Sequence, residues 1–170
     1  GWAVGSYTYK RMNRIYAKRQ AFLGEIHIRY KDGSHEIIGT DETWKVTEEG
    51  NFLEAEFYDG EVYDATVKLE NSSFHNAGIE KMKIEPQLLV QYGSPVKAHE
   101  QFEPVSCELS PSGMLIYDFG QNMAGVIEAD IQGRAGEKIV FYHAEVLLNG
   151  ELYTKPLRSA KQQAVYICKE

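Results

Sequence analysis

The sequence predicts an all-β fold of antiparallel β-sandwich type with little helix. Three observations support this class: short runs that alternate polar and apolar residues, turn sequences rich in glycine, proline, asparagine and aspartate between these runs, and a single segment of helix-like composition. Strand-length runs separated by such turns are typical of antiparallel sandwiches. The chain has 170 residues, of which 43% are hydrophobic, and this is enough for a buried core.

The first pair of strands is predicted around a tight turn. Residues Glu25 to Tyr30 alternate polar and apolar side chains, and the chain then passes through Lys31-Asp32-Gly33-Ser34 into His35 to Ile38. Because Asp-Gly tolerates the positive φ angles of a tight turn, we expect a β-hairpin here. Similar runs predict further strands at Trp44 to Thr47, Tyr63 to Leu69 and Leu88 to Tyr92.

The segment from Asn71 to Pro86 shows little periodicity and is the best candidate for a long loop or linker. It divides the chain into two expected domains, residues 1–85 and residues 86–170. In the second domain, turns are expected at Pro111-Ser112-Gly113, at Gly133 to Gly136 and at Asn149-Gly150. The strands between them are predicted at Val105 to Leu109, Met114 to Tyr117, Gly125 to Ile131, Lys138 to His143 and Gln163 to Ile167.

Only Tyr9 to Phe22 has a helix-like composition, and its apolar spacing is irregular. We expect a basic surface loop or a short helix, with a site for an acidic partner as the alternative.

Charge and hydropathy exclude several classes of partner. The formal net charge of -7 opposes binding to nucleic acid, which depends on clustered lysine and arginine. The sequence contains neither a membrane-spanning apolar run nor a signal-like start, so we expect a soluble region with no membrane partner. Its compartment, cytoplasmic or exported, is left open.

The two cysteines, Cys107 and Cys168, lie in apolar strand-like contexts. Such contexts favour buried reduced thiols, and a disulfide between the two cysteines is the alternative. Neither cysteine has a CxxC partner or a closely spaced histidine, so a zinc site is not expected.

Three motifs in the second half follow one another at defined spacing: Tyr117 to Gly125, His143 to Leu147, and Leu157 to Lys161. In the first motif, we expect Gly120 and Gly125 to adopt backbone angles closed to other residues, which favours a bend between strands over a ligand-contacting surface.

The polar residues of the second and third motifs have alternative uses. His143 and Glu145 would share a face of a continuous strand and could pair, whereas a catalytic acid-base role has little support. Arg158, Ser159 and Lys161 follow a proline-containing loop, so they belong either to a docking surface for another domain or to a solvated loop.

The first half contains Thr40-Asp41-Glu42-Thr43-Trp44-Lys45 and then Tyr58-Asp59-Gly60-Glu61-Val62-Tyr63-Asp64-Ala65. Together with the three motifs of the second half, these segments resemble the accessory β modules of bacterial α-L-rhamnosidases. Gly1-Trp2 and Tyr30 to Gly33 also fit, and Thr66 stands where the family usually has arginine. The resemblance implies jelly-roll modules that precede an (α/α)₆ catalytic barrel.

Carbohydrate-binding residues are expected in the first half. Aromatic rings stack on the apolar face of a pyranose, and carboxylates accept hydrogen bonds from its hydroxyl groups. The same oxygens suit Ca²⁺, which is the one cofactor considered. The alternative is structural, with core aromatic residues and turn-forming aspartates. The candidates are Trp44, Tyr58, Asp59, Glu61 and Asp64.

No pair of carboxylates is singled out by spacing or context as a catalytic pair, so no catalytic residue is assigned. The resemblance implies a noncatalytic region of an enzyme that hydrolyses terminal α-L-rhamnosides. Its expected partners are the catalytic barrel of the same parent chain and L-rhamnose-containing glycans. The alternatives are a free-standing carbohydrate-binding module and a purely structural or interaction domain.

Overall fold

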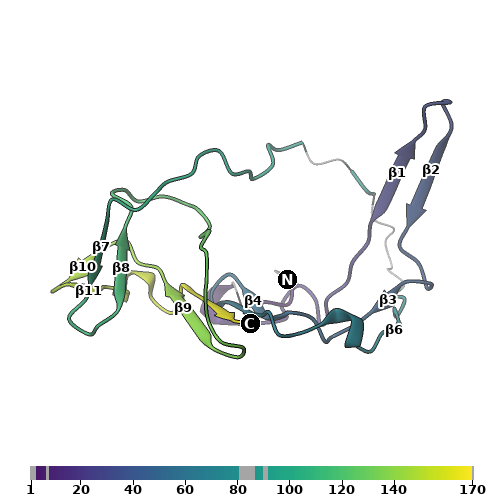
Figure 1. Ribbon diagram of the computed structural model, residues 1–170. Coiled ribbons are helices and arrows are strands. Elements are labelled where there is room, and N and C mark those ends of the chain that lie inside the picture. The colour runs from purple at the N-terminus through teal and green to yellow at the C-terminus, as the bar shows by residue number, and fades with distance from the viewer. Residues whose placement is uncertain (1–2, 7, 81–86, 90–91, 170) are drawn as a thin grey trace. The chain divides into compact units, whose positions relative to one another are not determined.

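The computed structural model describes residues 3–6, 8–80, 87–89 and 92–169. Within these ranges the chain forms short strands and 3-10 helices, and no described helix exceeds three residues (Figure 1). The predicted all-β class is therefore confirmed. The elements are η1 (Tyr9–Arg11), β1 (Glu25–Arg29), β2 (His35–Gly39), β3 (Lys45–Val46), β4 (Phe52–Glu56), β5 (Gly60–Asp64), η2 (Leu69–Asn71), β6 (His75–Asn76), β7 (Ser106–Leu109), β8 (Leu115–Asp118), β9 (Lys138–Tyr142), β10 (Leu147–Leu148), β11 (Glu151–Leu152), η3 (Lys155–Leu157) and β12 (Gln163–Ile167).

The chain divides into two compact units. One unit comprises Gly1–Asn51 and Val67–Tyr92, and the other comprises Phe52–Thr66 and Gly93–Glu170. The second unit therefore combines a segment from the first half of the sequence with the whole of the last part. The division at residue 85 that the sequence suggests stays a prediction.

The largest sheet lies in the second unit and has the strand order β4-β5-β12-β9. The β5 and β12 strands run parallel, whereas the outer pairs are antiparallel. Val165 and Ile167 of β12 are buried, as is Cys168 directly after it. The most buried apolar side chains of the described residues thus lie on the strand that joins the two halves of this sheet.

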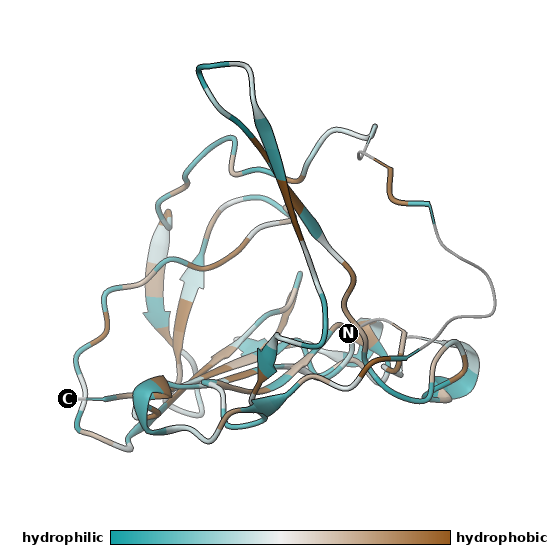
Figure 2. Cartoon of the chain, turned by 90° about the vertical axis from the view of Figure 1, so that its right-hand side faces the viewer, coloured by the Kyte–Doolittle hydropathy of each residue, from teal (hydrophilic) through white to brown (hydrophobic). Residues whose placement is uncertain are grey.

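The β1–β2 hairpin of the first unit forms as predicted. Its register runs from Glu25 opposite Gly39 to Arg29 opposite His35. In the turn, the Asp32 Oδ1 atom accepts hydrogen bonds from the Ser34 amide (2.9 Å) and hydroxyl (2.6 Å), and Gly33 has a φ of +88°. Figure 2 shows hydrophilic residues at the tip of this hairpin and both hydrophobic and hydrophilic residues along its strands.

Two further hairpins of the second unit have turns at the predicted sites. At the β7–β8 turn, Gly113 has a φ of +85°, and the buried Ser110 Oγ accepts a hydrogen bond from the Met114 amide at 3.2 Å. At the β10–β11 turn, Asn149 and Gly150 both have positive φ, as a tight two-residue hairpin turn requires. The Ser112 amide donates to the Glu151 carboxylate at 2.6 Å, which ties the two turns together.

Several predicted elements are absent or shorter. The predicted strand from Gly125 to Ile131 is not formed: these residues pair with no described strand, and Val126 is almost fully exposed. The strand expected at Tyr63 to Leu69 ends at Asp64. The one expected at Trp44 to Thr47 is reduced to the two residues of β3. Residues 90 and 91 of the run at Leu88 to Tyr92 lie outside the described residues, and 88, 89 and 92 are not in a strand.

The helix-like segment Tyr9 to Phe22 forms only η1. Lys10, Arg11 and Arg14 have positive φ angles, which an α-helix of L-residues does not accept. Of the two structures expected there, the loop is therefore present. Strand β4 was not predicted, and it pairs with β5 through an irregular register between Phe52 and Glu54.

Candidate functional site

Trp44 belongs to the first unit and follows a turn that Asp41 stabilises. The Asp41 Oδ1 atom accepts hydrogen bonds from the Thr43 hydroxyl (2.6 Å) and amide (2.8 Å), and these bonds lower the pKa of the Asp41 carboxyl. The Trp44 Nε1 atom donates to the Gly39 carbonyl at 3.1 Å, and its ring lies 6.3 Å from that of Phe22. The indole is therefore held in place with its N–H used by the backbone, while 37% of the residue stays exposed.

Tyr58 and Asp59 form the connection between β4 and β5 in the second unit. The Tyr58 amide donates to the Glu56 carboxylate at 2.8 Å, and its carbonyl accepts a hydrogen bond from the Lys161 amide at 2.8 Å. The backbone of this connection is thus fixed both by its own strand and by the segment before β12.

Gly60 is the point of closest approach between this connection and β12. It has a φ of +82°, and a Cβ atom added to it would lie 1.9 Å from the Gln163 carbonyl oxygen. Only glycine accommodates both the angle and the approach. The neighbouring Glu61 lies opposite Ala164 in the parallel ladder, so its backbone belongs to the same pairing of β5 with β12.

Tyr63 contributes its ring to an aromatic cluster on three adjacent strands. Its ring stacks on that of Tyr166 (centroids 5.8 Å apart, planes 7° apart) and meets the ring of Phe52 edge-on at 5.0 Å. Such pairs stabilise a sheet beyond the area they bury. The ring of Tyr63 therefore has packing partners within the sheet, although Tyr63 and Tyr166 are only half-buried and Phe52 is exposed.

Asp64 ends β5 and stabilises the turn that follows. Its Oδ1 atom accepts hydrogen bonds from the Thr66 hydroxyl (2.6 Å) and amide (2.9 Å). These bonds, with a smaller contribution from the positive charge of Lys138, lower the pKa of the Asp64 carboxyl. The carboxylate is therefore stabilised in its charged form by its own loop.

The five predicted carbohydrate-binding residues are divided between the two units. Trp44 lies in the first, whereas Tyr58, Asp59, Glu61 and Asp64 follow one another along one turn and strand of the second. Calcium requires about six to eight oxygen ligands. No group of three or more acidic, histidine or cysteine side chains in the described part of the chain is arranged to hold a metal ion.

In the bend after β8, one of the two glycines has the backbone angle that the sequence predicts. Gly120 has a φ of +75°, and its amide donates to the Asp118 Oδ1 atom at 2.7 Å. Gly125 is not in the left-handed region, so the expectation of a special backbone angle there was wrong.

His143 and Glu145 do not share a strand, because β9 ends at Tyr142. Instead, the amide and the Nδ1 atom of His143 each lie 3.0 Å from the Gln162 carbonyl oxygen, and the amide donates to it. Both cysteines are free thiols, and only Cys168 is buried. The prediction that Cys107 is buried was wrong.

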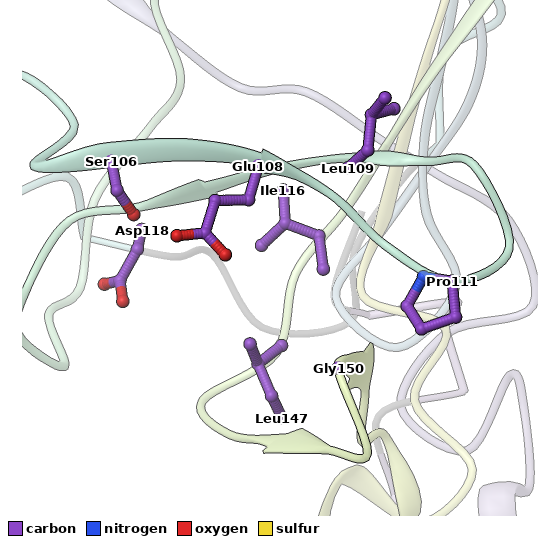
Figure 3. A pocket seen from close by; sticks show the side chains of 8 residues that line it. All are labelled: Ser106, Glu108, Leu109, Pro111, Ile116, Asp118, Leu147 and Gly150. Atoms are coloured by element: carbon purple, nitrogen blue, oxygen red, sulfur yellow. The ribbon is translucent and has the colours of Figure 1, made fainter.

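A hollow of about 340 Å³ lies between the β7–β8 and β10–β11 hairpins. Figure 3 shows the side chains of Glu108, Ile116 and Asp118 pointing toward it from one face of β7–β8, whereas the Leu109 side chain points to the opposite side. Sequence reasoning did not single out this hollow, because it depends on how two hairpins meet. Its lining residues are Ser106, Glu108, Leu109, Pro111, Ile116, Asp118, Leu147 and Gly150.

Comparison with protein families identifies the chain. The family model of the α-L-rhamnosidase N-terminal domain matches residues 1–108, and that of the bacterial α-L-rhamnosidase concanavalin-like domain matches residues 108–169. The chain belongs to the α-L-rhamnosidase family. The suspected family resemblance is thereby confirmed, and the chain corresponds to the N-terminal β-rich region of these proteins.

Individual relatives agree with this assignment. The α-L-rhamnosidase of Alteromonas sp. (strain LOR) is 29% identical over 85% of this chain, and that of Streptomyces avermitilis is 28% identical over 99%. Among solved structures, the Streptomyces avermitilis α-L-rhamnosidase complexed with L-rhamnose superimposes with a TM-score of 0.86 at 27% identity over 99% of this chain. The native α-L-rhamnosidase of Aspergillus terreus gives 0.80 at 30% identity over 98%.

The rhamnosidase region described here is much shorter than these relatives. It spans 17% of the length of the Alteromonas and Streptomyces proteins and 20% of the Aspergillus chain. None of its described helices has the length and apolar character needed to span a membrane.

Proposed function

We propose that this chain is a noncatalytic β-rich region of a longer α-L-rhamnosidase that hydrolyses terminal α-L-rhamnosides, with the catalytic residues in another part of the polypeptide. The observation that carries the proposal is the consecutive match of two rhamnosidase domain families, in order, over residues 1–169. The much greater length of the relatives supports it, because most of each relative has no counterpart in these residues. The role of the region is to support the catalytic domain of the same parent chain.

Two carboxylates of the recognisable motifs, Asp41 and Asp64, are unsuited to the role of the glycosidase acid. Glycosidases need one carboxyl group that stays protonated near neutral pH and a second one at a defined separation. Asp41 and Asp64 have the opposite property, since hydrogen bonds from their own turns lower their pKa values. Such groups hold turns together and are poor proton donors.

The proposal is tested with the full-length parent and with residues 1–170 alone, each assayed on an aryl α-L-rhamnoside. We expect the parent to release the aryl group and the 170-residue chain to release none. Turnover by the short chain would overturn the noncatalytic role. A folded parent that cleaves another aryl glycoside and leaves the α-L-rhamnoside intact would overturn the rhamnosidase assignment.

Glycan binding is a second candidate function, and Trp44 is the residue that favours it. Its indole N–H is bound to Gly39, and part of the residue stays exposed, as a stacking platform for a sugar requires. The complex of the Streptomyces relative with L-rhamnose makes this sugar the first ligand to test. The segment of Tyr58, Asp59, Glu61 and Asp64 is the second location proposed for such a site.

Calorimetric titration of the full-length parent with L-rhamnose, in calcium and in chelator, tests this candidate. If the sugar stacks on Trp44, Trp44→Ala should abolish the heat of L-rhamnose binding at that site. The control is Tyr142→Ala, which removes an exposed aromatic ring of the second unit and should leave this heat unchanged. If millimolar L-rhamnose gives no heat in either condition, the binding role is rejected. Heat that survives Trp44→Ala and disappears in Glu61→Ala would move the site to the second location.

A further inference from the structure

The hollow between the β7–β8 and β10–β11 hairpins has walls that are fixed relative to each other. Both hairpins belong to the second unit. The Glu151 carboxylate of β11 accepts hydrogen bonds from the Ser112 amide at 2.6 Å and from the Ser112 hydroxyl at 3.0 Å. Beside this contact, a Cβ atom added to Gly150 would lie 3.2 Å from the Pro111 Cδ atom. The two turns are therefore bonded and packed together, and the hollow belongs to one compact unit.

One side of the hollow is rich in hydrogen-bond acceptors. Ser106 lies opposite Asp118 and Glu108 lies opposite Ile116, so these four residues share one face of the hairpin. The Glu108 carboxylate points toward the hollow and makes no hydrogen bond or ion pair with another described residue. The Asp118 carboxylate also points toward it, and its Oδ1 atom accepts the Gly120 amide at 2.7 Å. A ligand here meets carboxylate oxygens that need hydrogen-bond donors.

The rest of the lining is apolar. Ile116 lies beside the carboxylates and is half-buried, and Leu147 of β10 and Pro111 of the β7–β8 turn line the hollow as well. Ligand sites in proteins typically combine apolar side chains with a few placed polar groups. The hollow has this composition, because two carboxylates and the Ser106 hydroxyl group stand against three apolar side chains.

This lining determines which class of ligand fits. Carboxylates repel anions, and no described residue of the lining carries a positive charge that would bind one. A pyranose ring matches both parts of the lining, since its hydroxyl groups donate to carboxylates while its C–H groups contact apolar side chains. Ligand pockets typically measure about 300–1,000 Å³. At about 340 Å³, the hollow has room for one sugar ring and not for a longer glycan segment.

We infer that this hollow is a binding site for a single deoxy-hexose residue, with L-rhamnose as the sugar. The hydroxyl groups of the sugar donate to Glu108 and Asp118, and its methyl and ring C–H groups contact Ile116 and Leu147. The choice of L-rhamnose rests on the proposed function, in which it is the first ligand to test. The site shares no residue with either location proposed there for glycan binding.

Hydrogen-deuterium exchange of the full-length parent, followed by peptide mass spectrometry, tests the inference at the hollow itself. At L-rhamnose concentrations ten times the dissociation constant, amides of β7–β8 and β10–β11 that exchange by local opening should exchange about tenfold more slowly. Glu108→Gln keeps the size of the side chain and removes its charge, so the same protection should require roughly tenfold more sugar. The matched control is Leu109→Gln, because the Leu109 side chain points to the opposite side and its replacement should leave the protection unchanged.

Three outcomes would overturn the inference. Exchange of both hairpins that does not change with L-rhamnose would show that the hollow binds no such sugar. Equal protection in Glu108→Gln and in the parent would show that the effect is transmitted from sugar bound elsewhere. Protection by L-arginine but not by L-rhamnose would assign the hollow to a cationic group.

The same experiment separates this site from the proposed function. A parent whose hairpins are protected by L-rhamnose but which does not cleave α-L-rhamnosides would refute the proposed function and leave the sugar site intact. Cleavage without protection would refute the sugar site alone.

Discussion

Replacing Gly60 with alanine is expected to separate β5 from β12. The new Cβ atom would lie 1.9 Å from the Gln163 carbonyl oxygen, whereas a carbon and an oxygen in contact lie about 3.3 Å apart or more. The two strands would therefore have to separate by more than about 1 Å at this point. The φ of +82° adds backbone strain for any residue with a side chain.

The two costs can be estimated separately. Holding a non-glycine residue in the left-handed region costs about 1–2 kcal/mol. Forcing an extra methyl group into a packed contact costs about 1–3 kcal/mol. Together they predict a loss of about 2–5 kcal/mol in the local stability of the four-stranded sheet.

Hydrogen-deuterium exchange of the full-length parent measures this loss at the sheet itself. Because about 1.4 kcal/mol corresponds to a factor of ten, amides of β5 and β12 should exchange roughly thirtyfold faster or more in Gly60→Ala. Gly50→Ala is the control, since Gly50 has no positive φ and its added Cβ atom meets nothing within 4 Å. Unchanged exchange in Gly60→Ala, or an equal increase in Gly50→Ala, would refute the reasoning.

Three further predictions concern individual contacts, each followed by unfolding of the full-length parent. Ser110→Ala removes the acceptor of the Met114 amide from a buried turn and should cost about 1–3 kcal/mol, whereas no loss would mean that the turn forms without it. Tyr63→Leu should lose about 1 kcal/mol of coupling to Tyr166 in a double-mutant cycle, and additive effects would contradict the stacking. The pKa of Asp64 is lowered by folding, so its contribution is present above its unfolded pKa and is lost as the pH falls through the folded value. Asp64→Asn should therefore reduce the acid dependence of stability, and an unchanged acid profile would contradict this.

The hairpins could be predicted because their turns depend on a few adjacent residues. Asp32 accepts hydrogen bonds from Ser34, and Gly33 supplies the positive φ, all within the motif itself. The β10–β11 turn is set in the same way by Asn149 and Gly150. Local chemistry therefore fixed both the location and the type of these turns.

The sheet order could not be predicted, because it depends on pairing between distant segments. Nothing near Val62 indicates that its parallel partner is Val165, far along the chain. The run from Gly125 to Ile131 shows the opposite error, since it has strand-like composition but no described partner. Strand propensity is realised only where a ladder partner completes the hydrogen bonds.

The candidate binding residues show a similar limit. Carboxylates and aromatic rings suit a sugar site, but the same groups stabilise turns and sheets, and composition does not distinguish these uses. In the Tyr58 to Asp64 motif the structure gives Gly60, Tyr63 and Asp64 contacts within the fold: an approach to Gln163, a stack on Tyr166 and a turn bond to Thr66. Their spacing is thus already explained by packing.

The packing of this motif also links the two segments that the family models match. Strand β5 lies within the segment matched by the N-terminal domain model, and β12 lies within that matched by the concanavalin-like domain model. Because the two strands are neighbours in one sheet, a change at Gly60 or Tyr63 acts on β12 as well as on β5. The two matched segments are therefore structurally dependent on each other, and the β4–β5 pair without β12 and β9 would be a marginally stable hairpin.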